Sequence, residues 1–432
     1  MDGDRALPAL SNASINLYAC GSFGTGLYST IPSVLLLYFC TETLKIPAAV
    51  AGVIVFVPKL WAVFWDPIVG RWSDRSRHSW GRRRPFLLAG LVGMLVTFVA
   101  LFSPPDTSWQ LAAIWAAFAY FALATLYSLY AVPYISLPAE LGATPEMRAM
   151  LIGRRMVAVM IGVLAGAAGA PFLVDLAGGG REGYRIMALV IGAICLAVMS
   201  MPIIMLRGRD RPLANRSAEQ KPKSSLLYDA LRNAVFLRLV GSFLAQLLAC
   251  GTLLSVLPYI VTKIIGRPEG DIAVALAVLL TFAILGVPLW TRLARQTSER
   301  ALLIAALAGF AVAVGMLGLG VAAGVAWSWV LVSLALAGIP FAALQVLPFT
   351  LVAHYIHERA ETEEASLTGV WTASEKVGLA GGSTLTASAI AMLGLNGAAI
   401  PIFLTVVTLA LCCAAAVLLP PARHENAEQT SS

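Results

Sequence analysis

Asp66-Pro67-Ile68-Val69-Gly70-Arg71-Trp72-Ser73-Asp74-Arg75-Ser76, continued by Gly81-Arg82-Arg83-Arg84-Pro85, is the stretch that decides the fold of this 432-residue chain. It begins with a carboxylate inside an apolar segment and ends in a cluster of arginines. Arginines gather in this way where a membrane-spanning segment leaves the hydrocarbon and meets anionic headgroups. The stretch therefore predicts a crossing from membrane depth to a membrane surface.

The composition predicts an all-α membrane protein. Hydrophobic residues make up 59% of the chain and charged residues 12%, whereas soluble domains carry about 25% charged residues. Apolar segments recur that are long enough to cross a hydrocarbon core of about 30 Å as helices. The net charge of +7 comes from basic residues between these segments, which argues against nucleic-acid binding. The six cysteines lie in apolar segments without the spacing of metal ligands or disulfides.

Twelve membrane spans are predicted, in two groups of six. They cover residues 15–40, 48–69, 86–102, 111–137, 156–177, 186–206, 236–265, 272–290, 301–323, 327–353, 367–395 and 398–419. The expected domains are an N-terminal six-helix bundle (1–206), a central loop (207–234) with a short helix near 226–231, a C-terminal six-helix bundle (235–420) and a tail (421–432). Because Lys and Arg concentrate in alternate loops, both termini and the central loop are expected to be cytoplasmic. No cleaved signal peptide is expected.

Very few ionisable residues lie at membrane depth. They are Lys59, Asp66, Glu375 and Lys376, with Arg155 at the mouth of the fifth span. Charge at this depth is costly unless it is paired or hydrated, so these positions are candidates for function. Asp66 is either a helix-end carboxylate that pairs with Arg71 or Arg75, or a buried acid that takes up and releases a proton. Lys376 is the candidate positive partner of Asp66 from the other half.

Small residues cluster in two of the predicted spans. They are Gly162, Gly166 and Gly169 in the fifth span and Gly378, Gly381 and Gly382 in the eleventh. Such spacing is typical of helices that pack closely, and equally of an interface that moves during function.

The Asp66–Ser76 and Gly81–Pro85 motifs together resemble the second-loop signature of the glycoside-pentoside-hexuronide:cation symporters, a branch of the major facilitator superfamily that includes melibiose permease. Similar elements are Gly21-Ser-Phe-Gly24, Val132-Pro133, Pro171-Phe172 before Gly178-Gly-Gly180, and Lys376 before the Gly-Gly-Ser at 381–383. The resemblance implies two six-helix bundles, a central cavity and alternating access driven by a coupling ion.

The resemblance also implies a cation-coupling site, from which this chain departs. Its matching members are Asp66, Ser128, Thr372 and Lys376. Ala62 stands where the family has a second acid of its sodium site, and Trp65 stands where it has an amide. Because sodium needs several hard oxygen ligands, whereas one carboxylate is enough for a proton, proton coupling or no coupling is expected in preference to sodium.

The expected substrate site departs from the family as well. Gly26 and Ala131 replace the acids that hold sugar hydroxyls in melibiose-type members. The candidate substrate-binding residues are Lys59, Tyr127, Arg155, Gln345, Trp371 and Lys376. Because cations remain while acids are lost, an anionic or amphiphilic organic solute is favoured over a neutral sugar.

A cytoplasmic gate is predicted from charged loop residues. Its members are Asp74, Arg75, Arg82, Arg83, Arg84, Glu363 and Glu364, which would pair across the cytoplasmic ends of the helices. The nearby His354 and His357 could instead hold a metal ion, since they share a helix face. The gate is the favoured interpretation, because no further ligand pattern follows them, and no metal site is predicted.

The predicted function is secondary active transport, as a proton-coupled symporter of a small organic solute such as a sugar, glycoside, organic anion or amphiphile. An exporter or an uncoupled facilitator of the same fold is the first alternative, and a polytopic membrane enzyme a remote one, as no HExxH or Ser-His-Asp set occurs at membrane depth. No cofactor is expected beyond the coupling ion, H⁺ before Na⁺. The expected partners are the substrate and membrane lipids, for a monomer in a bacterial inner membrane.

Overall fold

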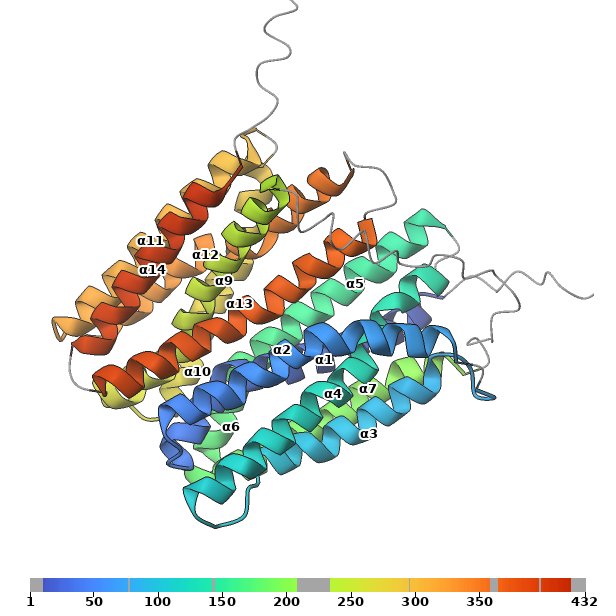
Figure 1. Cartoon of the computed structure of the whole chain (residues 1–432), viewed down its shortest axis with the longest axis horizontal. Helices are drawn as coiled ribbons and strands as arrows, with labels where there is room; N and C mark the ends of the chain where they lie inside the picture. The colour runs from blue at the N-terminus through green and yellow to red at the C-terminus, as the bar shows by residue number, and fades with distance from the viewer. Residues whose placement is uncertain are drawn as a thin grey trace, which may run out of the picture. The chain divides into compact units, whose positions relative to one another are not determined.

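The computed structural model describes residues 11–76, 78–141, 144–207, 234–294, 296–357, 364–395 and 398–420, and these form helices and turns without a strand. Contacts group the chain into two compact units, residues 1–217 with 268–273 and residues 218–267 with 274–432. We refer to them as the first and the second unit. Figure 1 shows the helices of both, coloured along the chain. The expected helix at 226–231 lies outside the described residues.

The first unit is built from six helical rods. They are α1 (Asn12–Tyr38) with η1 (Phe39–Thr43), α2 (Ala48–Asp74), α3 (Arg84–Leu101), α4 (Trp109–Leu141), α5 (Pro145–Leu164) with η2 (Ala165–Gly169) and α6 (Ala170–Leu176), and α7 (Gly180–Met205). Within this unit α1 packs against α5 and α7, α4 packs against α2 and α3, and α3 packs against α7. The glycines Gly178, Gly179 and Gly180, with φ of 90°, 71° and 59°, allow the tight turn between α6 and α7, since other residues rarely adopt this conformation.

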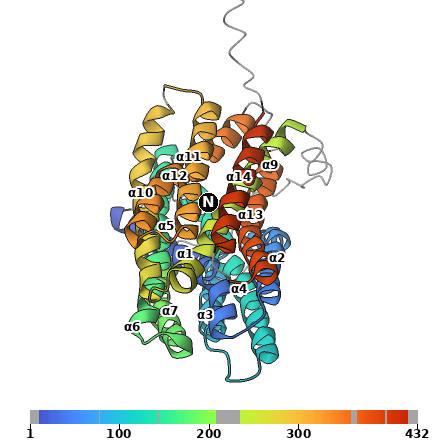
Figure 2. The ribbon, with the colours of Figure 1, turned by 90° about the vertical axis from the view of Figure 1, so that its left-hand side faces the viewer.

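The second unit repeats this pattern of packing. Its helices are α9 (Ala234–Tyr259) with η3 (Ile260–Ile264), α10 (Gly270–Leu293), α11 (Glu299–Ala322), α12 (Trp327–His357), α13 (Glu364–Leu393) and α14 (Ala399–Leu418). Here α9 packs against α13 and α14, and α11 packs against α12 and α14. In each unit, therefore, the first helix packs against the fifth and the sixth: α1 against α5 and α7, and α9 against α13 and α14. Figure 2 shows the same helices after a turn of 90° about the vertical axis.

Among the described residues, 11 helical segments are long and apolar enough to cross a membrane. They correspond to all of the predicted spans except the eleventh, which is α13. Most predicted boundaries differ from the observed ones by a few residues, but the start of α5 differs more.

The helix α5 begins at Pro145 instead of residue 156. Thr144 caps it, because its side-chain oxygen accepts a hydrogen bond from the Met147 backbone N–H at 3.2 Å, and proline follows at the first helical position. The charged residues Glu146, Arg148, Arg154 and Arg155 hid this part of the helix from a search for apolar spans. Arg154 and Arg155 therefore lie inside a helix that begins about ten residues before the predicted apolar span.

The small residues are explained by close packing within each unit. A Cβ on Gly162 of α5 would collide with the backbone carbonyl of Phe23 on α1. A Cβ on Gly382 of α13 would lie 2.5 Å from the backbone of Gly251 on α9. Gly169, in contrast, has open space around its Cα. Small residues allow helix backbones to approach in this way where hydrocarbon provides no driving force of its own.

Candidate functional site

Asp66 lies in the interior of α2, which continues to Asp74, about 12 Å further along the helix axis. Its side chain is half-buried, and Oδ1 is hidden from solvent. The next residue is Pro67, which lacks the N–H that would bond the carbonyl of Val63 in a regular helix. Asp66 is therefore held in an interrupted part of the helix and not at its end.

Two tryptophans beside Asp66 attach α2 to α4. The indole N–H of Trp61 donates to the hydroxyl oxygen of Thr125 at 3.1 Å, and the indole N–H of Trp65 donates to the carbonyl oxygen of Thr125 at 3.0 Å. The two indole rings stack, with centroids 5.6 Å apart. An indole N–H is a donor only, so Trp65 cannot act as an oxygen ligand for a cation. Sequence reasoning missed Thr125, because a hydroxyl in an apolar span carries no signal of its partners.

Of the two hydroxyl residues expected in the cation site, the structure describes the side chain of Ser128 but not that of Thr372. Ser128 of α4 is 1% exposed, and its hydroxyl donates to the carbonyl oxygen of Ala124 at 3.1 Å. This bond uses the proton of Ser128 and leaves oxygen lone pairs that can still accept. The neighbouring Tyr127 is half-buried. Thr372 lies in α13, and its side chain is outside the described part of the structure.

A cluster of buried hydroxyl groups joins α1 to α4. The hydroxyls of Ser22 and Tyr134 are 2.8 Å apart, and the Tyr134 hydroxyl also donates to the carbonyl oxygen of Tyr18. The Tyr18 and Tyr134 rings are in contact, with centroids 4.9 Å apart. Tyr130, one turn before Tyr134, donates to the carbonyl oxygen of Met199 on α7 at 2.9 Å. The spacing of these tyrosines in α4, on one helix face, was the available sequence signal.

Arg155 of α5 lies within electrostatic range of the Tyr18 and Tyr134 hydroxyl groups. It is half-buried, and its Nε is hidden from solvent without a hydrogen bond. Among the described residues, no carboxylate forms an ion pair with it. A guanidinium in this condition can bind an anionic group in two-pronged geometry. Lys59 of α2 is half-buried in the same unit.

In the second unit, Trp371 is a packing residue. It is 2% exposed, and its indole stacks on Phe243 with ring centroids 4.0 Å apart while Phe349 meets it edge-on. Contact between Trp371 and a substrate would therefore require this aromatic stack to open. Gln345 of α12 and Lys376 of α13 are half-buried.

The charged residues of the expected gate are partly paired within the first unit. Nη2 of Arg83 lies 2.6 Å from Oδ1 of Asp74, and Nη1 of Arg83 donates to the hydroxyl of Ser73. Arg83 is 4% exposed and Asp74 is 56% exposed. Arg84 donates to the carbonyl oxygen of Ile203 on α7 at 3.3 Å, so the loop is also attached to α7. Sequence reasoning missed Ser73, although it directly precedes Asp74.

The other gate residues differ in their surroundings. Arg82 is buried and Arg75 is exposed at the end of α2. Glu363 lies outside the described residues, and Glu364 opens α13 with its side chain not described. The same holds for the side chains of His354 and His357 in α12. In the part of the chain that the structure describes, no cluster of three or more His, Cys, Asp or Glu residues could hold a metal ion.

Comparison with known proteins identifies the family. The chain is 26% identical over 246 residues to the inner membrane symporter YicJ of Escherichia coli, covering 55% of this chain and 51% of that protein. It is 26% identical over 220 residues to the isoprimeverose transporter of Lactiplantibacillus pentosus, covering 50% and 46%. The matches span between 24% and 51% of the length of the curated relatives.

The solved structures agree on the fold. The structure of a D-xylose-proton symporter superposes with a TM-score of 0.72 at 14% sequence identity, over 94% of this chain and 98% of that one. The model of the family described as MFS/sugar transport protein matches residues 17–419, which is nearly the whole chain. The chain therefore belongs to the MFS/sugar transport protein family.

Proposed function

We propose that this protein is a proton-coupled symporter that moves a small, sugar-like organic solute across the membrane by alternating access. Membership of a family of sugar transporters supports the transport activity, as do relatives that are named a symporter and a transporter. The proton is proposed as the coupling ion because of the residues that surround Asp66.

The observation that carries the proposal is the single carboxylate of Asp66 beside Trp65. Ala62, one turn before Asp66, is 6% exposed and offers no ligand. Trp65 is turned to the Thr125 carbonyl and offers only a donor. Of the oxygen ligands that sodium requires, the first unit provides the carboxylate of Asp66 and the hydroxyl of Ser128. One carboxylate that is alternately wet and dry can carry one proton.

The expected solute is an anionic derivative of a sugar or a similar organic anion. Arg155 provides a guanidinium without an ion pair to any described carboxylate, within electrostatic range of the hydroxyl groups of Tyr18 and Tyr134. Guanidinium and hydroxyl groups together suit a ligand that carries both a carboxylate or sulfonate and hydroxyls. Gly26 carries no side chain and therefore adds no negative charge that would compete with the solute for Arg155.

We also propose that the chain crosses the membrane twelve times. We take α13 as the eleventh of twelve spans, because its 30 residues extend about 45 Å as a helix, long enough to cross the membrane. The bundles are then residues 1–206 and 235–420, with the loop 207–234, the tail 421–432 and both termini in the cytoplasm, as the distribution of Lys and Arg indicates. The pair Asp74–Arg83 belongs to a cytoplasmic gate, and the protein works as a monomer in a bacterial inner membrane.

The test is solute-induced proton movement in proteoliposomes that contain the full chain and a pH-sensitive dye. Neutral sugars, glycosides, sugar acids and organic anions are added in turn, with and without sodium. We expect a proton signal with an acidic sugar derivative that Asp66→Asn abolishes, because the variant cannot carry a proton. Asp106→Asn is the matched control, since Asp106 is an exposed loop acid whose ion pair among the described residues is with Arg181 at 3.4 Å.

Arg155→Gln should raise the solute concentration needed for the signal and leave the proton-to-solute ratio unchanged. Sodium-dependent uptake without proton movement would overturn the proposed coupling. Uptake of neutral sugars that is unaffected by Arg155→Gln would overturn the proposed substrate class.

A further inference from the structure

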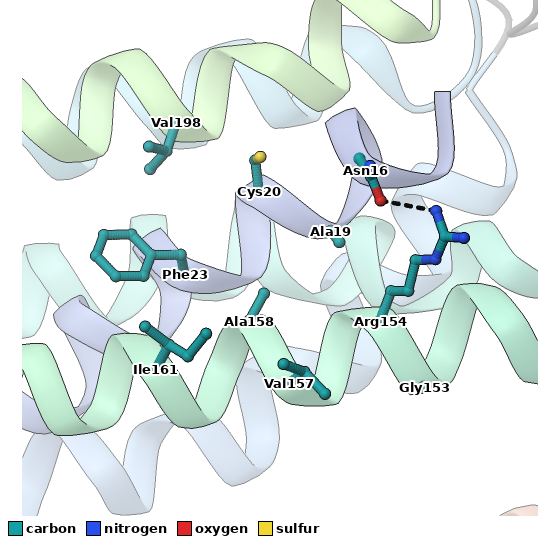
Figure 3. Close-up of a pocket in the computed structure, with 10 residues that line it drawn as sticks. All are labelled: Asn16, Ala19, Cys20, Phe23, Gly153, Arg154, Val157, Ala158, Ile161 and Val198. Carbon is teal, nitrogen blue, oxygen red and sulfur yellow. Dashed lines mark hydrogen bonds between the residues drawn. The ribbon is translucent and has the colours of Figure 1, made fainter. Parts of the chain in front are cut away.

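A groove with a volume of about 540 Å³ lies on the first unit, between α1, α5 and α7. Figure 3 shows the residues that line it. Those from α1 are Asn16, Ala19, Cys20 and Phe23, those from α5 are Gly153, Arg154, Val157, Ala158 and Ile161, and α7 provides Val198. The volume is within the range of ligand pockets, about 300 to 1,000 Å³.

The groove is a gap between α5 and α7 with α1 as its floor. The residues from α1 follow the spacing of one helix face, from Asn16 to Phe23, and those from α5 do the same from Gly153 to Ile161. We call these two rows of residues the α1 stripe and the α5 stripe. Each is about 11 Å long, roughly a third of the hydrocarbon core of a bilayer. The α7 helix packs against α1 and against α6, which follows α5 in the chain. The groove lies further toward the beginning of α5, where α5 and α7 both pack against α1.

The groove is polar at one end and apolar along the rest. Arg154 and Asn16 lie together at one end of the view in Figure 3, and Phe23 and Ile161 lie toward the other. The polar end is level with the beginning of α1, because Nη1 and Nη2 of Arg154 bond to the backbone and side-chain oxygens of Asn12, the first residue of α1, at 3.2 and 2.8 Å. Nη1 also donates to Oδ1 of Asn16 at 2.7 Å.

All of these acceptors are neutral, so the positive charge of Arg154 is not balanced by an ion pair with any described residue. Arg154 and Arg155 are neighbours in α5 and therefore point about 100° apart around the helix. Arg155 lies within electrostatic range of Tyr18, whereas the side chain of Arg154 lines the groove.

We propose that the groove binds an anionic phospholipid, with one acyl chain between α5 and α7 and the phosphate at Arg154. Apolar walls alone do not select an acyl chain from the bilayer, since lipid tails are as apolar as the walls. Selectivity comes from the unbalanced guanidinium, which favours a headgroup with net negative charge over a zwitterionic one. One arginine near a membrane surface corresponds to about a fivefold preference.

The test uses the full chain in lipid nanodiscs that contain photo-crosslinkable phosphatidylglycerol or phosphatidylcholine, with the reactive group in the acyl chain. Mass spectrometry then locates the crosslinks. We expect phosphatidylglycerol to label residues of the α1 and α5 stripes about fivefold more than phosphatidylcholine does. Arg154→Gln should remove this preference, and Arg154→Lys should keep most of it.

Two further variants separate the groove from general surface charge. Arg148→Gln removes an exposed cation from the same helix, and the labelling of the groove should not change. Ala158→Trp fills the groove and should reduce labelling by both lipids, while the protein still elutes as a single species. Equal labelling by the two lipids in the unmodified protein, a preference that survives Arg154→Gln, or crosslinks confined to other helices would each overturn the proposal. The readout is binding, so it does not depend on the proposed transport activity.

Discussion

Trp65 on α2 donates its indole N–H to the backbone carbonyl of Thr125 on α4, at a distance of 3.0 Å. This bond gives Trp65, the chain neighbour of Asp66, a hydrogen-bond partner on another helix. Because an indole N–H only donates, Trp65 offers no oxygen ligand to a cation. The bond links α2 to α4 directly beside the candidate coupling residue Asp66.

We expect Trp65→Phe to lower the free energy of unfolding by about 1 kcal/mol, because the ring still stacks on Trp61 but the hydrogen bond to Thr125 is lost. The midpoint of thermal unfolding in detergent measures this effect. Trp72→Phe is the control, since Trp72 is exposed and contacts Phe86 only through its ring. Equal shifts for the two variants would contradict the role given to the Trp65 bond.

The double variant Ala62→Asp/Trp65→Asn should gain stimulation of transport by sodium, because it adds a carboxylate and an amide oxygen within one turn of Asp66. Uptake into proteoliposomes with and without sodium measures the change. Each single variant alone should show a weaker response. A double variant that transports but ignores sodium would show that ligand number does not select the ion here.

Replacing Asp74 and replacing Arg83 should lower the free energy of unfolding by different amounts. Asp74→Ala leaves a buried guanidinium without this carboxylate and is expected to cost about 2 kcal/mol or more. Arg83→Met is expected to cost less, because the exposed Asp74 is then solvated and Ser73 keeps its hydrogen bond to the Gly70 carbonyl. Arg75→Gln is the exposed control, with a change within about 0.5 kcal/mol. Thermal unfolding of the four proteins gives the order, and the reverse order for Asp74 and Arg83 would contradict the assignment.

Gly26→Ala should destabilise the protein by about 1 to 3 kcal/mol, since its Cβ would lie 2.7 Å from the carbonyl oxygen of Val159 and force α1 and α5 apart. Gly153→Ala is the matched control in the same pair of helices, because nothing lies within 4 Å of its Cβ. It should be neutral or stabilise by up to about 1 kcal/mol, as alanine favours the helix. Unfolding midpoints that do not separate the two variants would show that α1 and α5 pack less closely than described.

Gln246→Leu in α9 should raise the unfolding midpoint. The side chain is fully buried, and neither its amide nitrogen nor its oxygen bonds to any described residue, so its removal relieves a cost of about 1 to 3 kcal/mol. A lower midpoint, or transport that is lost while the fold persists, would show that the amide has a partner during the transport cycle.

The sequence alone was sufficient for the class of protein, the family resemblance and most helices. Hydrocarbon requires long apolar helices, so Gly180–Met205 and Ala399–Leu418 are visible in composition. The motif around Asp66 was enough for the family, which the match over residues 17–419 shows. The start of α5 was not visible, because it depends on a cap at Thr144 and on polar residues that continue a helix outside the apolar span.

Only the tertiary structure decided what the individual side chains contact. Trp65 and Trp371 are both aromatic residues in apolar spans, yet Trp65 bonds to Thr125, whereas Trp371 stacks on Phe243 and meets Phe349 edge-on. Arg154 and Arg155 are adjacent and identical, yet Arg154 lines a groove, whereas Arg155 does not line it and lies within electrostatic range of Tyr18. Sequence specifies which residues must be buried in a membrane, because that follows from the free energy of transfer. The partner of each buried group depends on which helices pack together, and this is a property of the folded chain.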